Sequence, residues 1–210
     1  DSLLKDSKEL SDQILFEPIP SGEKFLAPII EALRDKTAIE MTYQGFTKDY
    51  PATFIVEPYC LKMFKQRWYM LAYSPGTDDM RVYGLDRIQA IEPSTEKYKI
   101  PKDFDAERYF KNTYGVSFAD DQPEEVKVKI SAYQANFLRS LPIHASQEEI
   151  ECNDEFSIFR YFVVPTFEFM QELRKYGSEL EVLSPQSLRD EFIDEAGSLY
   201  SKYYGEEEQA

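Results

Sequence analysis

Arginine and aromatic residues recur at short spacing in the central part of this chain, and their chemistry gives the first indication of a function. The residues that carry this pattern are Tyr43, Arg67, Tyr69, Arg81, Tyr83 and Arg87. A guanidinium group presents a fixed fork of donors that matches a phosphate, and it also stacks on flat rings. The pattern therefore suits a nucleotide or a single-stranded nucleic acid, which needs positive charge for its phosphates and flat surfaces for its bases.

Two predicted strands must position these side chains. Residues 67–73 and 81–91 are apolar and aromatic runs, and the segment SPGTDD between them consists of turn-forming residues. Alternation along the first strand places Arg67 and Tyr69 on one face. Unbroken alternation along the second strand gives a single face to Arg81, Tyr83, Leu85 and Arg87.

A salt bridge or a plain surface position is the competing interpretation of these arginines. Asp86 and Glu57 are the acidic residues that we consider as partners. Trp68 has a ring that stacks bases in other proteins, but a lone Trp in an apolar strand usually belongs to a core. We likewise expect Cys60 to be a buried and unreactive thiol.

Several separated motifs of this region resemble one known family, the WYL-domain family of bacterial transcription regulators. The family signature is a Trp-Tyr-Leu strand followed by an Arg-x-Phe-x-Leu-Asp-Arg-Ile strand. The corresponding motifs here are Glu57-Pro58-Tyr59, Trp68-Tyr69-Met70 and RVYGLDRI at residues 81–88. Met70 replaces the Leu and Tyr83 replaces the Phe, and both changes keep most of the apolar volume. The resemblance covers residues 38–100, and a looser resemblance to the family's C-terminal extension covers the rest.

This resemblance implies a ligand-binding Sm-like or SH3-like barrel, in which Arg81 and Arg87 fall on positions similar to the family's ligand-facing basic residues. Full-length members typically carry a winged helix-turn-helix upstream, and no such motif is recognised in residues 1–37. Because the first residue is Asp1 and not Met, we expect a fragment of a longer protein. Duplex DNA is then expected to bind only through that upstream domain.

The composition predicts a folded protein without a membrane segment. The chain has 210 residues, 42% of them hydrophobic, with 15 Phe and 15 Tyr, which is enough for two small cores. It contains neither an apolar run near the length of a membrane span nor a signal-peptide pattern. Its 2 cysteines do not form a disulfide framework, so we expect a reducing cytoplasm.

The distribution of charge disfavours a broad surface for duplex DNA. The net charge is −15, whereas such a surface needs a basic footprint. Residues 38–100 are neutral, with 8 Lys or Arg and 8 Asp or Glu, but residues 123–210 hold 8 Lys or Arg against 18 Asp or Glu, a net charge of −10. A local positive pocket is therefore expected only in the central segment.

Hydrophobic periodicity predicts a mixed α+β chain with two domains and an N-terminal extension. We assign residues 1–37 to an arm and a linker helix, residues 38–120 to a small β-barrel, and residues 121–210 to a ferredoxin-like domain. The five strands expected in the barrel are residues 38–43, 53–56, 59–64, 67–73 and 81–91. The second domain is expected in the order β-α-β-β-α-β plus a terminal helix. Its predicted elements are residues 125–131, 133–141, 148–152, 156–164, 167–176 and 180–183, followed by the helix from Pro185 to Tyr204.

The linker helix has an apolar stripe and a candidate start signal. Ser21 is the expected N-cap, and Phe25, Ile29 and Leu33 recur at four-residue spacing. Pro28 lies inside this pattern, so the helix is expected either to kink there or to begin at Ala27-Pro28.

Signatures of catalysis and of metal binding are scarce. His144 is the one histidine, and nothing in the sequence brings a serine or cysteine nucleophile to it. Neither CxxC nor HxxxH occurs, and no glycine-rich phosphate loop is present. The acidic pairs Asp190-Glu191 and Asp194-Glu195 are expected to form a solvated helix face. We therefore expect no enzyme, no metal and no cofactor.

The sequence leads to one main functional hypothesis and two alternatives. In the main hypothesis the chain is the ligand-sensing and oligomerisation region of a transcriptional regulator. It would form a homodimer whose geometry is set by the second domain, and its effector would be short single-stranded DNA or a nucleotide. The first alternative is a structural dimerisation module without a small ligand. The second is a hydrolase, which would require an unexpected pair of carboxylates in a cleft.

Overall fold

The computed structural model describes residues 22–117 and 122–204, which fall into two compact units divided between Phe104 and Asp105. Each unit has its own antiparallel sheet and its own apolar core. The expected mixed α+β class is confirmed. The predicted arm over residues 1–20 and the predicted N-cap at Ser21 lie outside the described residues.

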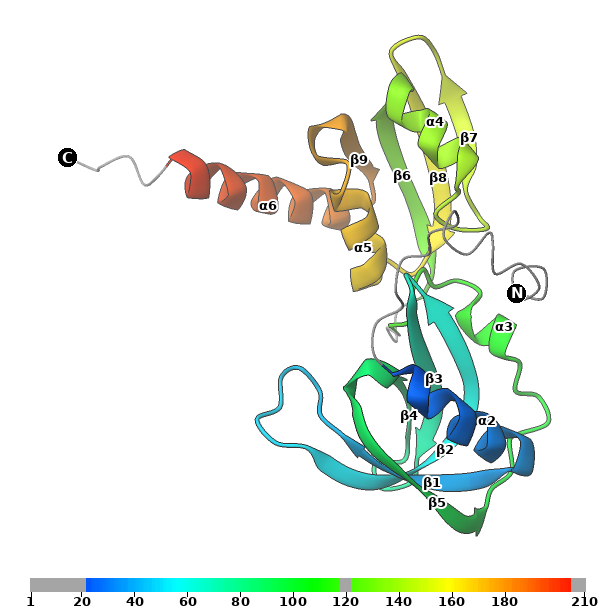
Figure 1. Cartoon of the computed structure of the whole chain (residues 1–210). Coiled ribbons are helices and arrows are strands. Elements are labelled where there is room, and N and C mark those ends of the chain that lie inside the picture. The colour runs from blue at the N-terminus through cyan, green and yellow to red at the C-terminus, as the bar shows by residue number, and fades with distance from the viewer. Residues whose placement is uncertain (1–21, 118–121, 205–210) are drawn as a thin grey trace, which may run out of the picture. The chain divides into compact units, whose positions relative to one another are not determined.

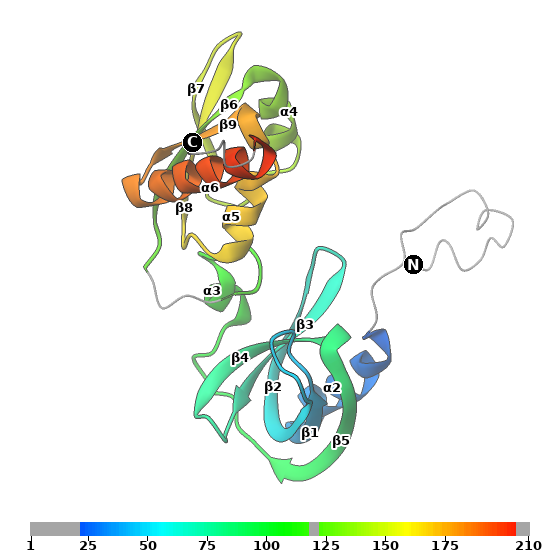
Figure 2. The ribbon, with the colours of Figure 1, turned by 90° about the vertical axis from the view of Figure 1, so that its left-hand side faces the viewer.

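The first unit is built on a five-stranded sheet with the order β4-β3-β2-β1-β5. Its strands are β1 (Thr37–Tyr43), β2 (Ala52–Phe64), β3 (Arg67–Ser74), β4 (Asp79–Gly84) and β5 (Ile88–Lys97). The sheet curls strongly (Figure 2). Its two edge strands β4 and β5 do not pair with each other, so the described residues form no closed barrel.

Strand β2 is one long strand, although the sequence predicted two short strands separated at Pro58. Residues 52–56 pair with β1 and residues 57–64 pair with β3, with a shift of register between Pro58 and Cys60. Proline has no N–H to donate to a ladder, and it is tolerated at such an irregularity. The prediction was wrong because the proline lies where the strand changes partner, not where it ends.

Strand β4 is shorter than predicted. The run expected to be one strand over residues 81–91 is divided by a 3₁₀ turn, η2 (Leu85–Arg87), after which β5 begins. The expectation that Arg87 shares a strand face with Arg81 and Tyr83 was therefore wrong. Leu85 is 1% exposed, so burial of this side chain holds the turn against the sheet.

The helix α2 (Leu26–Asp35) covers the core of the first unit and follows the 3₁₀ turn η1 (Glu23–Phe25). Pro28 is the third residue of α2, in the first turn, where a backbone N–H has no partner within the helix. The helix begins two residues before Pro28 and does not need a kink there. The buried residues of this core are Phe25, Ile29, Ala32, Ile39, Met41, Val56, Met70, Ala72, Tyr83, Leu85 and Ile88.

The predictions for Trp68 and Cys60 can be judged against the burial of their side chains. Trp68 is partly buried and packs against the core of the first unit, as expected. Cys60 is half-buried, and burial raises the pKa of its thiol while nearby Lys62 acts weakly in the other direction. Because the thiolate is the reactive form, this environment disfavours a catalytic cysteine.

The second unit has a four-stranded sheet with the order β7-β8-β6-β9. Its elements are α3 (Ala106–Phe110), β6 (Glu124–Ser131), α4 (Ala132–Ser140), β7 (Glu148–Cys152), β8 (Phe156–Val163), α5 (Phe167–Arg174), η3 (Gly177–Glu179), β9 (Leu180–Ser184) and α6 (Gln186–Tyr204). The predicted order β-α-β-β-α-β with a terminal helix is confirmed. Alternation along β6 and β8 gives one face to the core and the other to polar and aromatic side chains.

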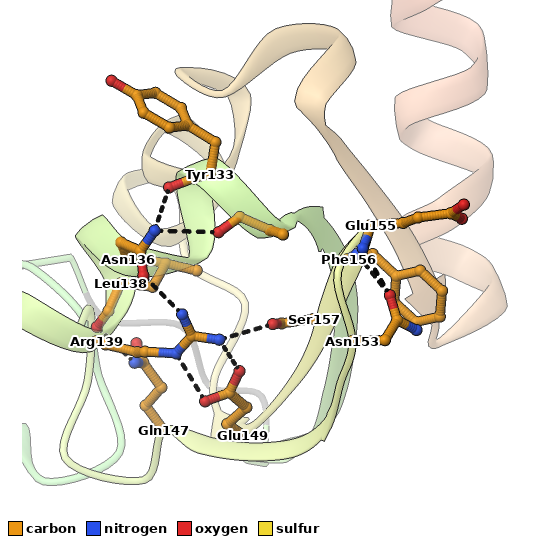
Figure 3. Close-up of polar contacts among 11 residues, drawn as sticks. Tyr133, Asn136, Leu138, Arg139, Gln147, Glu149, Asn153, Glu155, Phe156 and Ser157 are labelled. Atoms are coloured by element: carbon orange, nitrogen blue, oxygen red, sulfur yellow. Dashed lines mark hydrogen bonds and ion pairs between the residues drawn. The ribbon is translucent and has the colours of Figure 1, made fainter.

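An ion pair between Arg139 of α4 and Glu149 of β7 connects the helix to the sheet of the second unit (Figure 3). Nε of Arg139 donates to Glu149 Oε2 at 2.9 Å, and its Nη2 donates to Ser157 Oγ at 3.0 Å. Its Nη1 donates to Asn136 Oδ1 at 2.8 Å, one turn away on the same helix. Ser157 is fully buried, so this arginine satisfies a hydroxyl that water cannot reach.

The helix α6 is only partly covered by the second unit. Leu188 near its start is 3% exposed and belongs to the core, and Phe192 packs against that core. The C-terminal half of the helix extends beyond the sheet (Figure 1). Leu199, Tyr200 and Tyr203 lie there with more than half of their surface exposed.

We predict that Gly22→Ala destabilises the first unit. Gly22 has φ +124°, and a Cβ there would lie 2.6 Å from the carbonyl carbon of Leu85 and 2.8 Å from the backbone nitrogen of Asp86. Backbone atoms cannot yield as the end of a side chain can, so we expect a loss of about 1–3 kcal/mol in the free energy of unfolding, measured by urea denaturation. A Cβ at Gly76 meets nothing within 4 Å, so Gly76→Ala is the control. An equal effect in both variants would contradict this account.

Candidate functional site

The turn after β4 places an arginine where a glycine leaves room for it. Gly84 has ordinary backbone angles, φ −73° and ψ 128°. A Cβ on it would lie 2.4 Å from Arg87 Nη2, 2.6 Å from Asp86 Oδ1 and 2.9 Å from Arg87 Nε. The glycine is therefore required by the space that the guanidinium group occupies and not by the conformation of the backbone.

The guanidinium group of Arg87 lies over two aromatic rings. Its central carbon is 4.8 Å from the centre of the Phe46 ring and 5.6 Å from the centre of the Tyr43 ring. Tyr43 is at the end of β1, and Phe46 lies in the loop that follows it. Arginine over the face of a ring gains about 0.5–2 kcal/mol, depending on how far it is removed from water. The two rings thus fix the direction of Arg87.

The carboxylate of Asp86 lies between two arginines. Its Oδ2 is 3.6 Å from Arg67 Nη1, and its Oδ1 is 3.6 Å from Arg87 Nε. Both separations are longer than a hydrogen bond. Asp86 Oδ1 and Arg87 Nε are buried atoms without a hydrogen-bond partner among the described residues. Native proteins rarely leave such atoms unused, so this cluster retains hydrogen-bonding capacity that the fold itself does not consume.

An open pocket of about 360 Å³ lies beside this turn. Its walls are the loop after β1 and the start of β5. The lining residues are Gln44, Gly45, Phe46, Lys48, Asp86, Arg87, Ile88 and Gln89. Pairing of Tyr43 with Ile88 brings these two segments together. Ligand pockets in proteins commonly have volumes of about 300–1,000 Å³, so a nucleotide-sized group is within the range of this one.

The pocket combines positive charge with an accessible ring. Arg87 and Lys48 line it, and Asp86 is the acidic residue in its wall. Arg67 lies on the other side of that carboxylate, with 46% of its side chain exposed. Phe46 is 78% exposed, which leaves its ring free to stack on a flat ligand. Charge for an anion and a flat apolar surface therefore occur together here.

The structure brings together three of the six residues proposed from the sequence: Arg67, Arg87 and Tyr43. Tyr83 packs edge-to-face on Tyr43 with a centroid distance of 5.2 Å, but it is 5% exposed and belongs to the core. Burial raises the pKa of the Tyr43 hydroxyl, and the charge of Arg87 acts in the opposite direction. Tyr83 therefore packs against the ring of Tyr43 and does not line the pocket.

The other two proposed residues lie apart from this cluster. Arg81 pairs across the sheet with Ala72, on the face that carries the core. Its guanidinium group is exposed, with Nε 3.6 Å from Asp79 Oδ2, and it does not line the pocket beside Arg87. Tyr69 pairs with Gly84, so it belongs to the opposite face of the sheet. The predicted alternation holds for residues 67–73 and for residues 81–84, but it gave neither the turn at residues 85–87 nor the register between the strands.

Four lining residues were not recognised in the sequence: Gln44, Phe46, Lys48 and Gln89. Three of them belong to the loop between β1 and β2, which the sequence analysis left between the predicted strands 38–43 and 53–56. The sequence signal for a binding loop was the aromatic Phe46 and the cationic Lys48, two residues apart and next to Gly45. That signal is weak because their approach to Arg87 depends on the pairing of β1 with β5.

The histidine of the second unit has a partner that the sequence did not reveal. Ser146 Oγ lies 2.8 Å from His144 Nδ1, and the Ser146 backbone N–H donates to the same nitrogen. Nδ1 is thus an acceptor, and Nε2 donates to the carbonyl oxygen of Lys111 at 2.8 Å. Ser146 Oγ also accepts from the backbone N–H of Phe162 at 2.9 Å. Because these atoms hold backbone groups, we assign the pair a structural role.

Neither metal binding nor a membrane span is indicated within the described ranges. No group of three or more His, Cys, Asp or Glu residues in residues 22–117 and 122–204 is arranged to hold a metal ion. No helix in these ranges is long and apolar enough to cross a membrane.

Comparison with protein families identifies two domains. The model of the WYL domain matches residues 24–93, a range that includes the whole pocket beside Arg87. The chain belongs to the WYL-domain family. The model of the WCX domain, the C-terminal extension of WYL regulators, matches residues 122–200. The family recognised from the sequence motifs is thus confirmed, and neither matching model describes a DNA-binding domain.

Two solved structures are similar to this WYL-domain chain. The proteasome accessory factor B/C (PafBC) of Arthrobacter aurescens is 20% identical, with a TM-score of 0.37, and the match covers 88% of this chain and 28% of that one. A CRISPR Cas-related protein is 14% identical, with a TM-score of 0.51, and the match covers 84% of this chain and 51% of that one. The second likeness shows a shared fold alone. No curated protein matches this chain.

We predict that Gly84→Ala displaces the Arg87 guanidinium group while the WYL domain stays folded. The added Cβ conflicts with the ends of two side chains, and the backbone at Gly84 accepts alanine. We expect the free energy of unfolding to change by less than about 1 kcal/mol, and the NMR signal of the Arg87 Nε–H group to shift. Gly45→Ala is the control, because a Cβ on this other pocket glycine first meets an atom at 3.9 Å. A much larger loss of stability in Gly84→Ala would show that the glycine serves the fold instead.

Proposed function

We propose that this chain is the ligand-sensing and oligomerisation region of a transcriptional regulator. The family match supports a regulatory sensing role, because WCX domains are the C-terminal extension of WYL regulators. The single observation that carries the choice of site is the Arg87 guanidinium group, which lies over two rings and lines a pocket. In this proposal the chain has no catalytic role.

The proposed effector is nucleic-acid-like: a short single-stranded DNA or a nucleotide. Arg87 and Lys48 would meet a phosphate, since both are cations that line the pocket. Phe46 would stack on a base, because its ring is the most exposed flat surface of the pocket. Arg67 would compete for Asp86 and so leave the Arg87 guanidinium group available to the ligand.

The mechanism that we propose is a linkage between effector binding and the arrangement of two copies. A ligand that binds one arrangement of the dimer better than another shifts the population towards it. Duplex DNA would then be contacted by a separate domain, since the net charge of −15 opposes a broad DNA-binding surface on this chain.

The finer fold assignment is part of this proposal. We assign residues 38–120 to an Sm-like sensor and residues 121–210 to a ferredoxin-like extension. The strong curl of the five-stranded sheet supports the first assignment (Figure 2). The order β7-β8-β6-β9, with helices α4 and α5 as connections, supports the second.

Fluorescence anisotropy with short labelled single-stranded oligonucleotides tests the proposed site. We expect Arg87→Ala to weaken binding at least about tenfold, the size of a lost charge-assisted hydrogen bond. Binding should also weaken steeply with salt, because phosphate contacts release counterions.

Arg81→Ala is the matched control for this titration. Arg81 lies in the same motif but is exposed and outside the pocket, so its loss should change the dissociation constant by less than about twofold. An equal loss in both variants would instead favour the wider site predicted from the sequence. No binding of any oligonucleotide by the unmodified chain would reject the nucleic-acid-like effector.

The second candidate function is a dimerisation module without a small ligand, and helix α6 is the observation that favours it. Five apolar or aromatic side chains on this helix are more than half exposed: Ile193, Leu199, Tyr200, Tyr203 and Tyr204. Tyr200 and Tyr204 stack with their ring centres 4.5 Å apart. A groove of about 900 Å³ lies along this half of the helix. A second copy of α6 supplies an apolar surface of the same kind.

We predict that Leu199→Glu combined with Tyr203→Glu reduces self-association. Two charges placed in an apolar interface lose their hydration and repel their copies in the partner. Analytical ultracentrifugation over a range of concentrations should show the dimer dissociation constant rising at least about tenfold. Tyr133→Glu is the control, because Tyr133 is 70% exposed on α4, far from α6 in sequence. A chain that is monomeric without any substitution would contradict this second candidate.

A further inference from the structure

The side-chain amides of Gln44 and Gln89, two residues of the Arg87 pocket, are hydrogen-bonded to each other, and Gln44 is also hydrogen-bonded to the backbone of its loop. Gln44 Nε2 donates to the carbonyl oxygens of Lys48 at 3.1 Å and Asp49 at 3.2 Å. Its Oε1 accepts from Gln89 Nε2 at 2.9 Å. Gln44 is the first residue after β1, and Gln89 is the second residue of β5. The contact therefore crosses the pocket from one wall to the other.

This chain of contacts determines which amide atom is which. An amide nitrogen and oxygen are usually assigned from their hydrogen-bond partners. Two backbone carbonyl oxygens face one atom of the Gln44 amide, so that atom must be the nitrogen. The Gln44 oxygen then points to Gln89, whose facing atom must in turn be its nitrogen. The backbone of the loop thus fixes the orientation of both side chains.

Gln89 consequently keeps one acceptor and one donor for a ligand. An amide has two N–H donors and a carbonyl oxygen, and a single donor is used in the contact with Gln44. In the described part of the chain, the Gln89 Oε1 and the second N–H have no hydrogen-bond partner. Gln89 is exposed and lines the pocket together with Phe46 and Arg87. An oriented donor and acceptor therefore stand beside a ring and a cation.

We propose that Gln89 reads the edge of an unpaired adenine base in the effector. This inference rests on the proposed nucleic-acid-like effector and adds the identity of the base. A glutamine amide pairs with adenine through an amino donor and a ring-nitrogen acceptor. Adenine offers this pair on both of its polar edges, cytosine offers it on its Watson–Crick edge alone, and guanine offers two acceptors on its major-groove edge. Arg87 meets the phosphate, Phe46 stacks on the base, and Gln89 selects it.

Gln44 acts on selectivity through Gln89 and is a positioning residue. Its amide uses both donors on Lys48 and Asp49, so it cannot itself turn to a ligand without opening the loop. A free glutamine side chain loses rotamer freedom when it binds. Gln89 has already lost part of that freedom in its contact with Gln44, which favours selective binding.

The test uses four labelled oligonucleotides of five nucleotides, each with thymidine at every position except a variable central one. The central base is adenine, cytosine, guanine or thymine. Fluorescence anisotropy gives a dissociation constant for each, and the readout is the ratio of these constants. We expect the adenine oligonucleotide to bind about fivefold or more tightly than the others, the lower end of discrimination by one bidentate pair.

Variants then locate the origin of the preference. We expect Gln89→Ala to reduce the ratio to less than about twofold, because the base then has no paired edge. Arg87→Ala should weaken all four oligonucleotides in parallel and keep the ratio. Gln171→Ala is the matched control, since Gln171 is an exposed glutamine on α5 that does not line the pocket.

The outcomes separate this inference from the proposed function. Equal binding of the four oligonucleotides, or a preference that survives in Gln89→Ala, overturns the inference and leaves the proposed effector class intact. A Gln89-dependent preference for another base overturns the assignment to adenine. Failure of the unmodified chain to bind any of the four overturns the proposed effector and the inference with it.

Discussion

The close fit of the Arg87 guanidinium group over Gly84 is the interaction on which the candidate site depends. The guanidinium group can lie over the rings of Tyr43 and Phe46 only because no Cβ stands in its way. The 3₁₀ turn that carries Arg87 is itself held by the buried side chain of Leu85 and by the close approach of Gly22. Two glycines far apart in sequence thus position the Arg87 side chain. Gly22 permits the close approach of backbone segments, and Gly84 leaves space for the guanidinium group.

Local patterns were sufficient for most of the elements. Hydrophobic periodicity predicted strands over residues 125–131 and 156–164 and a helix over residues 185–204, and the structure contains β6, β8 and α6 there. The errors occurred where tertiary contacts outweigh local preference. Pro58 does not end β2, because the strand changes partner there. Residues 85–87 leave the strand because packing of Leu85 against the core stabilises a turn that nothing in the run 81–91 marks clearly.

The candidate site was less predictable than the fold, since it is assembled from pairing and not from pattern. Arg87 and Tyr43 could be proposed from their chemistry alone. The loop residue Phe46 could not, because it reaches Arg87 only through the register that sets Tyr43 opposite Ile88. Tyr83 had the right chemistry for a ligand but is used for packing, with 5% of its surface exposed. Residue type therefore suggested the proposed class of ligand, and strand register determined which residues line the pocket.

The ordinary backbone angles of Gly84 have a consequence for the divergence of related sequences. A glycine kept for a positive φ is retained whatever its neighbours are, but one kept for space is retained only while its neighbour fills that space. Position 84 should therefore vary together with position 87: glycine where an arginine follows, and alanine or larger residues where the arginine has been replaced. Such paired variation would mark the relatives that have lost the arginine of this turn while keeping the same fold.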